Sequence, residues 1–99
     1  MWKIQIHPLV LEKDFSKIDS TVQRKILKAI HKKLSISPEQ YGKPLGGPFK
    51  NYWRLRVEDY RVIYRIEKDC VEVFVVKVGI RRDDEVYRQF ALRLTKLAR

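Results

Sequence analysis

The chain has 99 residues, of which 44% are hydrophobic and 34% are charged, a composition typical of one highly charged globular domain. Its longest uninterrupted run of aliphatic or aromatic side chains, residues 73–76, is far shorter than the ~20 apolar residues of a membrane-spanning helix. Residues 1–20 lack the apolar core of a secretory signal, and the lone cysteine, Cys70, excludes an intrachain disulfide framework. We therefore expect residues 1–99 to form a single domain that works in the cytoplasm and makes no membrane contact.

The distribution of charge gives the main indication of function. The net charge is +10 and the pI is about 10.0. Residues 1–49 hold nine Lys or Arg against four acids, and residues 50–99 hold thirteen against eight, so each half carries +5. The excess therefore belongs to the folded body, which attracts polyanions, and nucleic acid is the commonest of these. An acidic protein partner is compatible with this charge, and a basic face that only keeps the domain soluble is the simpler alternative.

The first half of the chain predicts a strand followed by two helices. Residues 2–6 alternate apolar and polar side chains, the pattern of a half-buried strand. Pro8 suits the first turn of a helix, and helical apolar spacing after it predicts a short helix over residues 8–17. Asp19 or Ser20 is expected to cap a second, amphipathic helix whose outer face is cationic. The apolar stripe of that helix consists of Val22, Ile26, Ile30 and Leu34.

Residues 35–51 then read as one long loop, because they hold three of the four glycines and three of the four prolines. The sequence Gly46-Gly47-Pro48 predicts a turn within this loop, and no phosphate-binding motif follows it.

Three strands and a final helix are expected after the loop. Residues 51–57 alternate, with apolar side chains on one face and tyrosine and arginine on the other. A tight turn at Glu58-Asp59 leads into a hairpin of two strands that are apolar on both faces and therefore covered on both sides. Cys70 is expected to be a small apolar residue within a strand of this hairpin. Asp83, Asp84 and Glu85 suit the start of the last helix.

The predicted order is therefore β-α-α-β-β-β-α. Because short turns join consecutive strands, we expect an α+β fold with an antiparallel four-stranded sheet. The N-terminal helical hairpin is expected on one face of this sheet, followed at the end of the chain by a C-terminal helix.

Common catalytic sets are missing from the sequence. No group of cysteines and histidines has metal-ligand spacing, and no motif supports Ser-His-Asp chemistry. His7 and His31 are isolated, and the acids that open the last helix are expected to cap it. We therefore expect neither a metal nor another cofactor.

Arginine and tyrosine remain as candidates for chemistry. Five arginines lie close to one another in the predicted sheet. Arg54 and Arg56 project from one side of one strand, and Arg61 begins the next. Arg81 and Arg82 follow the last strand. Guanidinium groups are long enough to converge on one phosphate, and their planar fork gives paired hydrogen bonds. Tyr87 would lie beside Arg81 and stack on a base. The residues alone leave two readings open: a phosphate site, or a solvated cationic face on which Tyr87 is a packing residue.

Three segments resemble the RelE branch of the RelE/ParE toxin superfamily: KPLGGP at residues 43–48, YWRLRVEDYRVIYRI at 52–66 and VKVGIRRDDEVY at 76–87. The element order matches over nearly the whole chain, so the resemblance implies a RelE-like fold and a toxin from a toxin–antitoxin pair. RelE-like toxins enter the ribosomal A site and cut the mRNA there. The implied partners are mRNA in the A site, ribosomal RNA, and a cognate antitoxin whose acidic, RelB-like segment wraps around the toxin.

The resemblance also implies roles for individual residues. Arg61 matches the strand arginine of the family, Arg81 the arginine after the last strand, and Tyr87 the tyrosine at the helix start. Arg54 stands at a position that is often lysine, and Tyr52 departs from the pattern because RelE has a second lysine there. Among the remaining cations, RNA contacts are expected from Lys50, Arg56 and Arg82.

The implied reaction needs no metal, because the 2′-hydroxyl of the substrate attacks the adjacent phosphate and the 5′-oxygen leaves. In this scheme Arg54 and Arg61 bind the phosphate and Arg81 stabilises or protonates the leaving oxygen. Tyr87 holds the nucleotide in line. Two alternatives share the basic surface: a non-enzymatic ParE-like inhibitor of DNA gyrase, and an RNA-binding module with a degenerate site.

Overall fold

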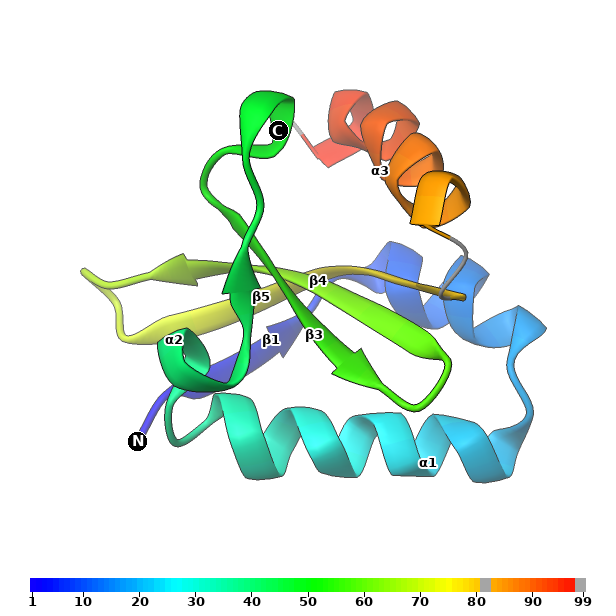
Figure 1. Ribbon diagram of the computed structural model, residues 1–99. Coiled ribbons are helices and arrows are strands. Elements are labelled where there is room, and N and C mark those ends of the chain that lie inside the picture. The colour runs from blue at the N-terminus through cyan, green and yellow to red at the C-terminus, as the bar shows by residue number, and fades with distance from the viewer. Residues whose placement is uncertain (81–82, 98–99) are drawn as a thin grey trace.

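A mixed sheet forms the centre of the protein (Figure 1). The computed structural model describes residues 1–80 and 83–97, and within them the sheet has five strands in the order β1-β5-β4-β3-β2. The strands are β1 (Lys3–Ile6), β2 (Lys43–Pro44), β3 (Tyr52–Val57), β4 (Tyr60–Glu67) and β5 (Glu72–Ile80). The antiparallel pairing of β3 with β4 and of β4 with β5 confirms the expected hairpins.

The expectation of a four-stranded, wholly antiparallel sheet is wrong in two respects. β1 pairs parallel to β5, from Lys3 opposite Glu72 to Ile6 opposite Val75. A short fifth strand, β2, pairs with the far edge of β3. A tight turn forces an antiparallel direction only on the two strands that it joins, whereas β1 is followed by helical segments long enough for a parallel crossover. β2 has two residues, too few to show an alternating pattern.

The helical elements follow the expected order but are more broken. A π-helical turn at Val10–Asp14 and a 3-10 turn at Phe15–Lys17 take the place of the predicted first helix. α1 (Ser20–Ala29) is capped by Asp19, whose carboxylate accepts a hydrogen bond of 3.1 Å from the backbone N–H of Thr21. A π-helical turn continues α1 to Leu34.

The segment expected as one long loop has regular structure. It contains α2 (Pro38–Tyr41), the strand β2 and a 3-10 turn at Gly47–Phe49, and this last turn confirms the one expected at Gly46-Gly47-Pro48. α3 (Asp83–Leu97) begins at the predicted acid. Within residues 1–80 and 83–97, no helix combines the length and the apolar character needed to cross a bilayer.

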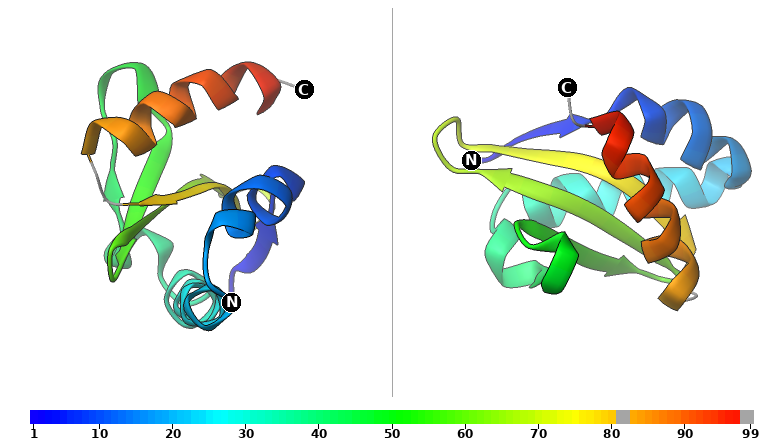
Figure 2. Two further views of the ribbon diagram at one scale, coloured as in Figure 1. Left: turned by 90° about the vertical axis from the view of Figure 1, so that its right-hand side faces the viewer. Right: turned by 90° about the horizontal axis from the view of Figure 1, so that it is seen from above.

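Two apolar cores lie on opposite faces of the sheet. The predicted stripe of α1 is confirmed, because Ile26, Ile30 and Leu34 are fully buried against one face. On the other face, α3 buries Val86 and Phe90 in a second core (Figure 2). The central strands β4 and β5 are therefore covered on both sides, as their apolar sequences indicate.

Cys70 does not lie in a strand. It is exposed in the turn between β4 and β5, where the backbone N–H of Val71 donates to the carbonyl of Lys68 at 3.3 Å. Val71 itself has a φ of 54°, a left-handed conformation that ends the turn. The turn therefore includes Cys70 and Val71, which the apolar pattern assigned to the strand.

The buried phenol of Tyr64 gives a pH-dependent prediction. Its hydroxyl donates to the carbonyl of Pro38 at 2.6 Å, and burial, with a smaller contribution from Glu39, raises the pKa of Tyr64. Tyr64→Phe is expected to cost about 1–3 kcal/mol of unfolding free energy at pH 7, because the Pro38 carbonyl loses its partner. Above about pH 10 the unfolded phenol ionises while the folded one keeps its proton, so the wild type loses stability that the variant retains.

The measurement for Tyr64 is urea unfolding of both proteins at pH 7 and at about pH 10.8. The difference between their unfolding free energies should shrink at the higher pH. A difference that is the same at both values would contradict the assignment of a buried, protonated phenol.

Candidate functional site

Three arginines gather on the face of the sheet that α3 covers, near the turn between β3 and β4. Arg56 lies directly opposite Arg61, and Arg54 lies opposite Ile63, which belongs to the second core. Directly opposite side chains have Cβ atoms about 5 Å apart and diagonal neighbours about 7–8 Å apart, so Arg61 has one arginine opposite it and another on the diagonal. We call Arg54, Arg56 and Arg61 the arginine cluster.

Exposure differs among the three members. Arg61 is only 8% exposed, Arg54 is half-buried and Arg56 is exposed. Like charges placed opposite each other in a sheet are destabilising, and an anion bound among them relieves that repulsion. The geometry therefore suits a ligand such as phosphate, with buried Arg61 as its inner contact.

Gly79 shapes the neighbourhood of Arg61. It lies opposite Arg61 on β5, and a Cβ added to it would lie 2.6 Å from Cγ2 of Val86. The missing side chain therefore makes the space in which the first turn of α3 packs on the sheet. Tyr87 is the next residue, so this close approach also fixes how near its backbone lies to β5.

A substitution at Gly79 tests this seating. Gly79→Ala is expected to push the first turn of α3 away from β5, because no real Cβ tolerates a 2.6 Å contact with a branched, buried side chain. We expect a loss of about 1–3 kcal/mol of unfolding free energy, the usual cost of overpacking. Val86→Ala in the same chain removes the clashing methyl groups and should restore part of that loss. Urea unfolding of the single and double variants measures it, and additive effects would contradict the contact.

Tyr87 belongs to a group of aromatic rings that joins α3 to the sheet. Its ring stacks on Phe49, with centroids 6.0 Å apart and planes 30° apart. Phe49 also packs on Phe90 at 5.4 Å, and Phe90 meets Tyr52 edge-on at 4.9 Å. Tyr52, which departs from the family pattern, is thus engaged in packing.

The structure places the sequence-predicted site residues as follows. Arg54, Arg56 and Arg61 lie together on one face. Tyr87 is half-buried on α3, and Lys50 is exposed directly after the Tyr87 contact residue Phe49. Sequence reasoning missed Phe49, whose position in the loop carries no periodic signal. Two further predicted residues, Arg81 and Arg82, lie outside the described residues.

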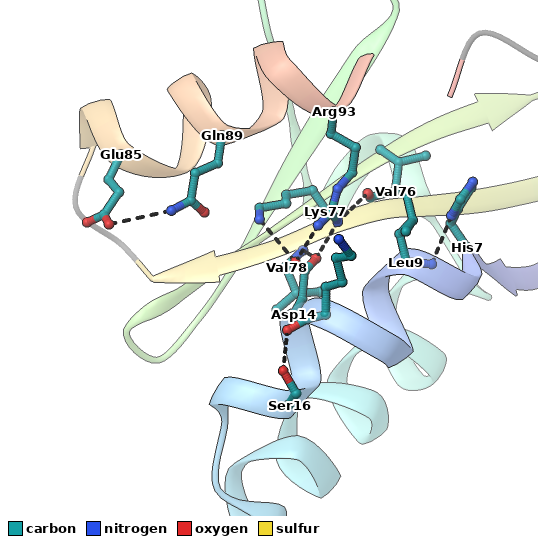
Figure 3. Close-up of polar contacts among 11 residues, drawn as sticks. His7, Leu9, Asp14, Ser16, Val76, Lys77, Val78, Glu85, Gln89 and Arg93 are labelled. Atoms are coloured by element: carbon teal, nitrogen blue, oxygen red, sulfur yellow. Dashed lines mark hydrogen bonds and ion pairs between the residues drawn. The ribbon is translucent and has the colours of Figure 1, made fainter. Parts of the chain in front are cut away.

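A second charged group, which sequence reasoning also missed, lies beneath α3 (Figure 3). Asp14 accepts hydrogen bonds from both terminal nitrogens of Arg93, at 2.7 and 2.8 Å, and from Nζ of Lys77 at 3.0 Å. All three residues are at most 9% exposed. Burial lowers the pKa of Lys77, an effect that Arg93 and Lys17 increase and Asp14 opposes. We call Asp14, Lys77 and Arg93 the buried ion cluster.

The buried ion cluster completes the open edge of β5. β1 ends at Ile6, and the N–H of His7 donates to the carbonyl of Val75. Beyond this point, no strand formed by residues 1–80 or 83–97 lies beside this edge of β5. The carboxylate of Asp14 accepts the N–H of Val78 at 2.9 Å, and Arg93 donates to the carbonyl of Val76 at 3.3 Å. Side chains thus satisfy backbone groups that a longer β1 would have satisfied.

A sequence signal for this cluster exists. Arg93 falls on the buried stripe of α3, three residues after Phe90, and Lys77 interrupts the apolar run of β5. Asp14 directly precedes the buried Phe15. A charged residue at a core position needs a partner of opposite sign, so these three are natural candidates for one another.

This architecture is shared with solved proteins of toxin–antitoxin complexes. The fold matches a chain of the toxin–antitoxin complex RelBE2 of Mycobacterium tuberculosis with a TM-score of 0.76 at 22% identity. The match covers 81% of this chain and 98% of the matched chain. It matches the intact Escherichia coli RelBE toxin–antitoxin complex with a TM-score of 0.65 at 25% identity, covering 81% of this chain and 96% of that one.

The sequence comparisons identify the family. The chain is 32% identical over 82 residues to the mRNA interferase toxin RelE of E. coli K12, covering 83% of this chain and 86% of that protein. Residues 4–85 match the family described as "ParE toxin of type II toxin-antitoxin system, parDE". The chain therefore belongs to the RelE/ParE superfamily of type II toxins, within which it is RelE-type. This confirms the resemblance noted in its sequence.

Proposed function

We propose that this toxin is an mRNA endoribonuclease that acts on the ribosome and thereby inhibits translation. The observation that carries the proposal is the arginine cluster, in which buried Arg61 has Arg56 opposite it and Arg54 on the diagonal. The name of the E. coli relative, an mRNA interferase toxin, supports the same activity. The net charge of +10 favours a polyanionic substrate.

The proposed chemistry uses the substrate's own nucleophile. The 2′-oxygen, whose proton passes to water, attacks the adjacent phosphorus and a new O–P bond forms. The bond to the 5′-oxygen breaks and this oxygen takes up a proton, leaving a cyclic phosphate and a 5′-hydroxyl. Arg61 and Arg54 bind the phosphate oxygens, on which negative charge increases in the transition state. Tyr87 stacks on the nucleotide and holds it in line, since alignment is itself a large rate factor.

The remaining predicted residues have supporting roles in this proposal. Arg81 stabilises or protonates the leaving oxygen, a role assigned from the resemblance in sequence. Lys50, Arg56 and Arg82 contact the RNA on either side of the scissile phosphate. The reaction requires no metal, because the attacking hydroxyl belongs to the substrate.

We further propose a cognate antitoxin as protein partner. The E. coli relative was solved as a toxin–antitoxin complex, and the basic charge of this chain is spread over both of its halves. A partner segment rich in acidic residues complements such a surface.

The test is a translation reaction in which cut mRNA is detected by primer extension. The wild type should produce cuts within the ribosome-bound codon, whereas Arg81→Ala and Tyr87→Ala, which removes the stacking ring, should cut much more slowly. Undiminished cutting by both variants would overturn the assignment of these residues. Failure of the wild type to cut in the presence of ribosomes would overturn the activity itself.

The match to a family described by ParE favours a second candidate, a non-enzymatic inhibitor of DNA gyrase. A supercoiling assay with purified gyrase, run beside the translation reaction, separates the two. Inhibited supercoiling with intact mRNA would support the second candidate, and cut mRNA with normal supercoiling would exclude it.

A further inference from the structure

We propose that Phe49 is the positioning residue that fixes the orientation of the Tyr87 ring on α3. The inference rests on the proposed function, in which Tyr87 holds the nucleotide. Phe49 comes from the loop before β3, yet its ring contacts two residues of α3, Tyr87 at 6.0 Å and Phe90 at 5.4 Å between centroids. The loop before β3 and α3 lie side by side on the same side of the sheet (Figures 1 and 2).

The loop that carries Phe49 is closed by backbone hydrogen bonds. The N–H of Phe49 donates to the carbonyl of Gly46 at 3.1 Å, and the N–H of Leu45 donates to the carbonyl of Tyr52 at 2.9 Å, which ties both ends of the loop together. Gly47 has a φ of 58° and Asn51 a φ of 83°. Glycine and asparagine adopt such left-handed conformations more readily than other residues. The turn residues and the backbone hydrogen bonds together set the path of the loop that brings Phe49 to α3.

The aromatic rings form one continuous series from the sheet to the surface. Tyr52 on β3 packs edge-on against Phe90, which is fully buried and acts as the anchor. Phe49 packs on Phe90, and Tyr87, which is half-buried, stacks on Phe49 at the outer end. A ring with a neighbour on one face loses alternative rotamers before the substrate arrives. The other face of Tyr87 then meets a nucleobase in one orientation, the arrangement that in-line attack needs.

The activity test compares Phe49→Leu with a matched control, Phe74→Leu. Both residues are half-buried phenylalanines that pack on the second core, but the ring partners of Phe74 are His7 and Arg65, not Tyr87. We expect Phe49→Leu to lower the kcat of mRNA cleavage by about 10- to 100-fold, because misplacement by about 1 Å has that effect. KM should change little, and Phe74→Leu should cut at nearly the wild-type rate. Phe49→Tyr keeps the ring and should restore kcat.

A second readout does not depend on activity. The protein is labelled with 3-fluorotyrosine, and the Tyr87 signal among the five tyrosines is assigned by its loss in Tyr87→Phe. Stacking on Phe49 displaces this fluorine signal from its position in the unfolded chain. Phe49→Leu should move it back toward that position, and Phe74→Leu should leave it in place.

Two results would overturn the proposal: equal loss of kcat in Phe49→Leu and Phe74→Leu, or an unchanged Tyr87 signal in Phe49→Leu. A selective loss of kcat together with a shifted signal supports it. If the wild-type protein does not cleave mRNA at all, the proposed function fails, and the fluorine signal alone decides whether Phe49 positions Tyr87.

Discussion

Replacement of Arg61 by lysine is expected to lower kcat/KM for mRNA cleavage by about 100- to 1,000-fold, the usual effect of removing one well-placed donor to a transition-state oxyanion. Lysine keeps the positive charge but replaces the planar, two-pronged fork with a single point of contact. Because Arg61 is only 8% exposed, water cannot easily enter to replace a hydrogen bond that the lysine side chain fails to make. The effect should therefore appear in the reaction rate more than in RNA binding.

Arg65→Lys is the matched control for this prediction. Arg65 lies on the same strand as Arg61, but it binds Glu67 and lies over the ring of Phe74, 5.2 Å from its centroid. It is outside the arginine cluster, so this substitution should leave cleavage within about threefold of wild type by the same reasoning. Cleavage rates of the two variants and the wild type are compared by primer extension under single-turnover conditions. Equal losses in both variants would show that the cluster has no special role.

Removal of the charge of Asp14 is expected to have the largest effect on stability. Asp14→Asn leaves two buried cations, Lys77 and Arg93, without a counter-charge, and breaking a buried pair in this way costs about 3–5 kcal/mol. The backbone N–H of Val78 also has a weaker acceptor in the variant. Urea unfolding followed by circular dichroism measures the change.

Glu58→Gln provides the control for Asp14→Asn, because it removes the same charge from an exposed pair. Lys25 and Glu58 are 3.7 Å apart, with side chains 57% and 55% exposed, and such pairs contribute about 0–1 kcal/mol. A small effect of Asp14→Asn, similar to that of the control, would contradict the role given to the buried ion cluster. Adding Lys77→Met and Arg93→Met to Asp14→Leu should recover stability, since apolar side chains of similar size replace such clusters well.

Local patterns were sufficient for much of the fold. The stripe of α1, the hairpins of β3, β4 and β5, and the start of α3 depend on residues close together in the chain, where periodicity and capping act directly. The arginine cluster was predictable for the same reason. Alternation along β3 puts Arg54 and Arg56 on one face, and the tight turn puts Arg61 opposite them.

Long-range packing decided what local patterns missed. The parallel pairing of β1 with β5 joins residues about 70 positions apart, and nothing within either strand specifies its direction. Cys70 lies in an exposed turn because Val71 takes a left-handed conformation to close the hairpin. Phe49 belongs to the site only because α3 packs over the loop that carries it.

The amino-acid sequence by itself indicated the class of protein, through its resemblance to a known family. It also indicated the basic character of the chain and the arginines proposed to bind a phosphate, because these depend on residue type and short-range alternation. The tertiary structure alone decided how α3 is held above them. Asp14 and Arg93 are 79 residues apart and meet only because a short β1 leaves the edge of β5 open. Their buried charges require one another, and that requirement helps to fix the helix that carries Tyr87.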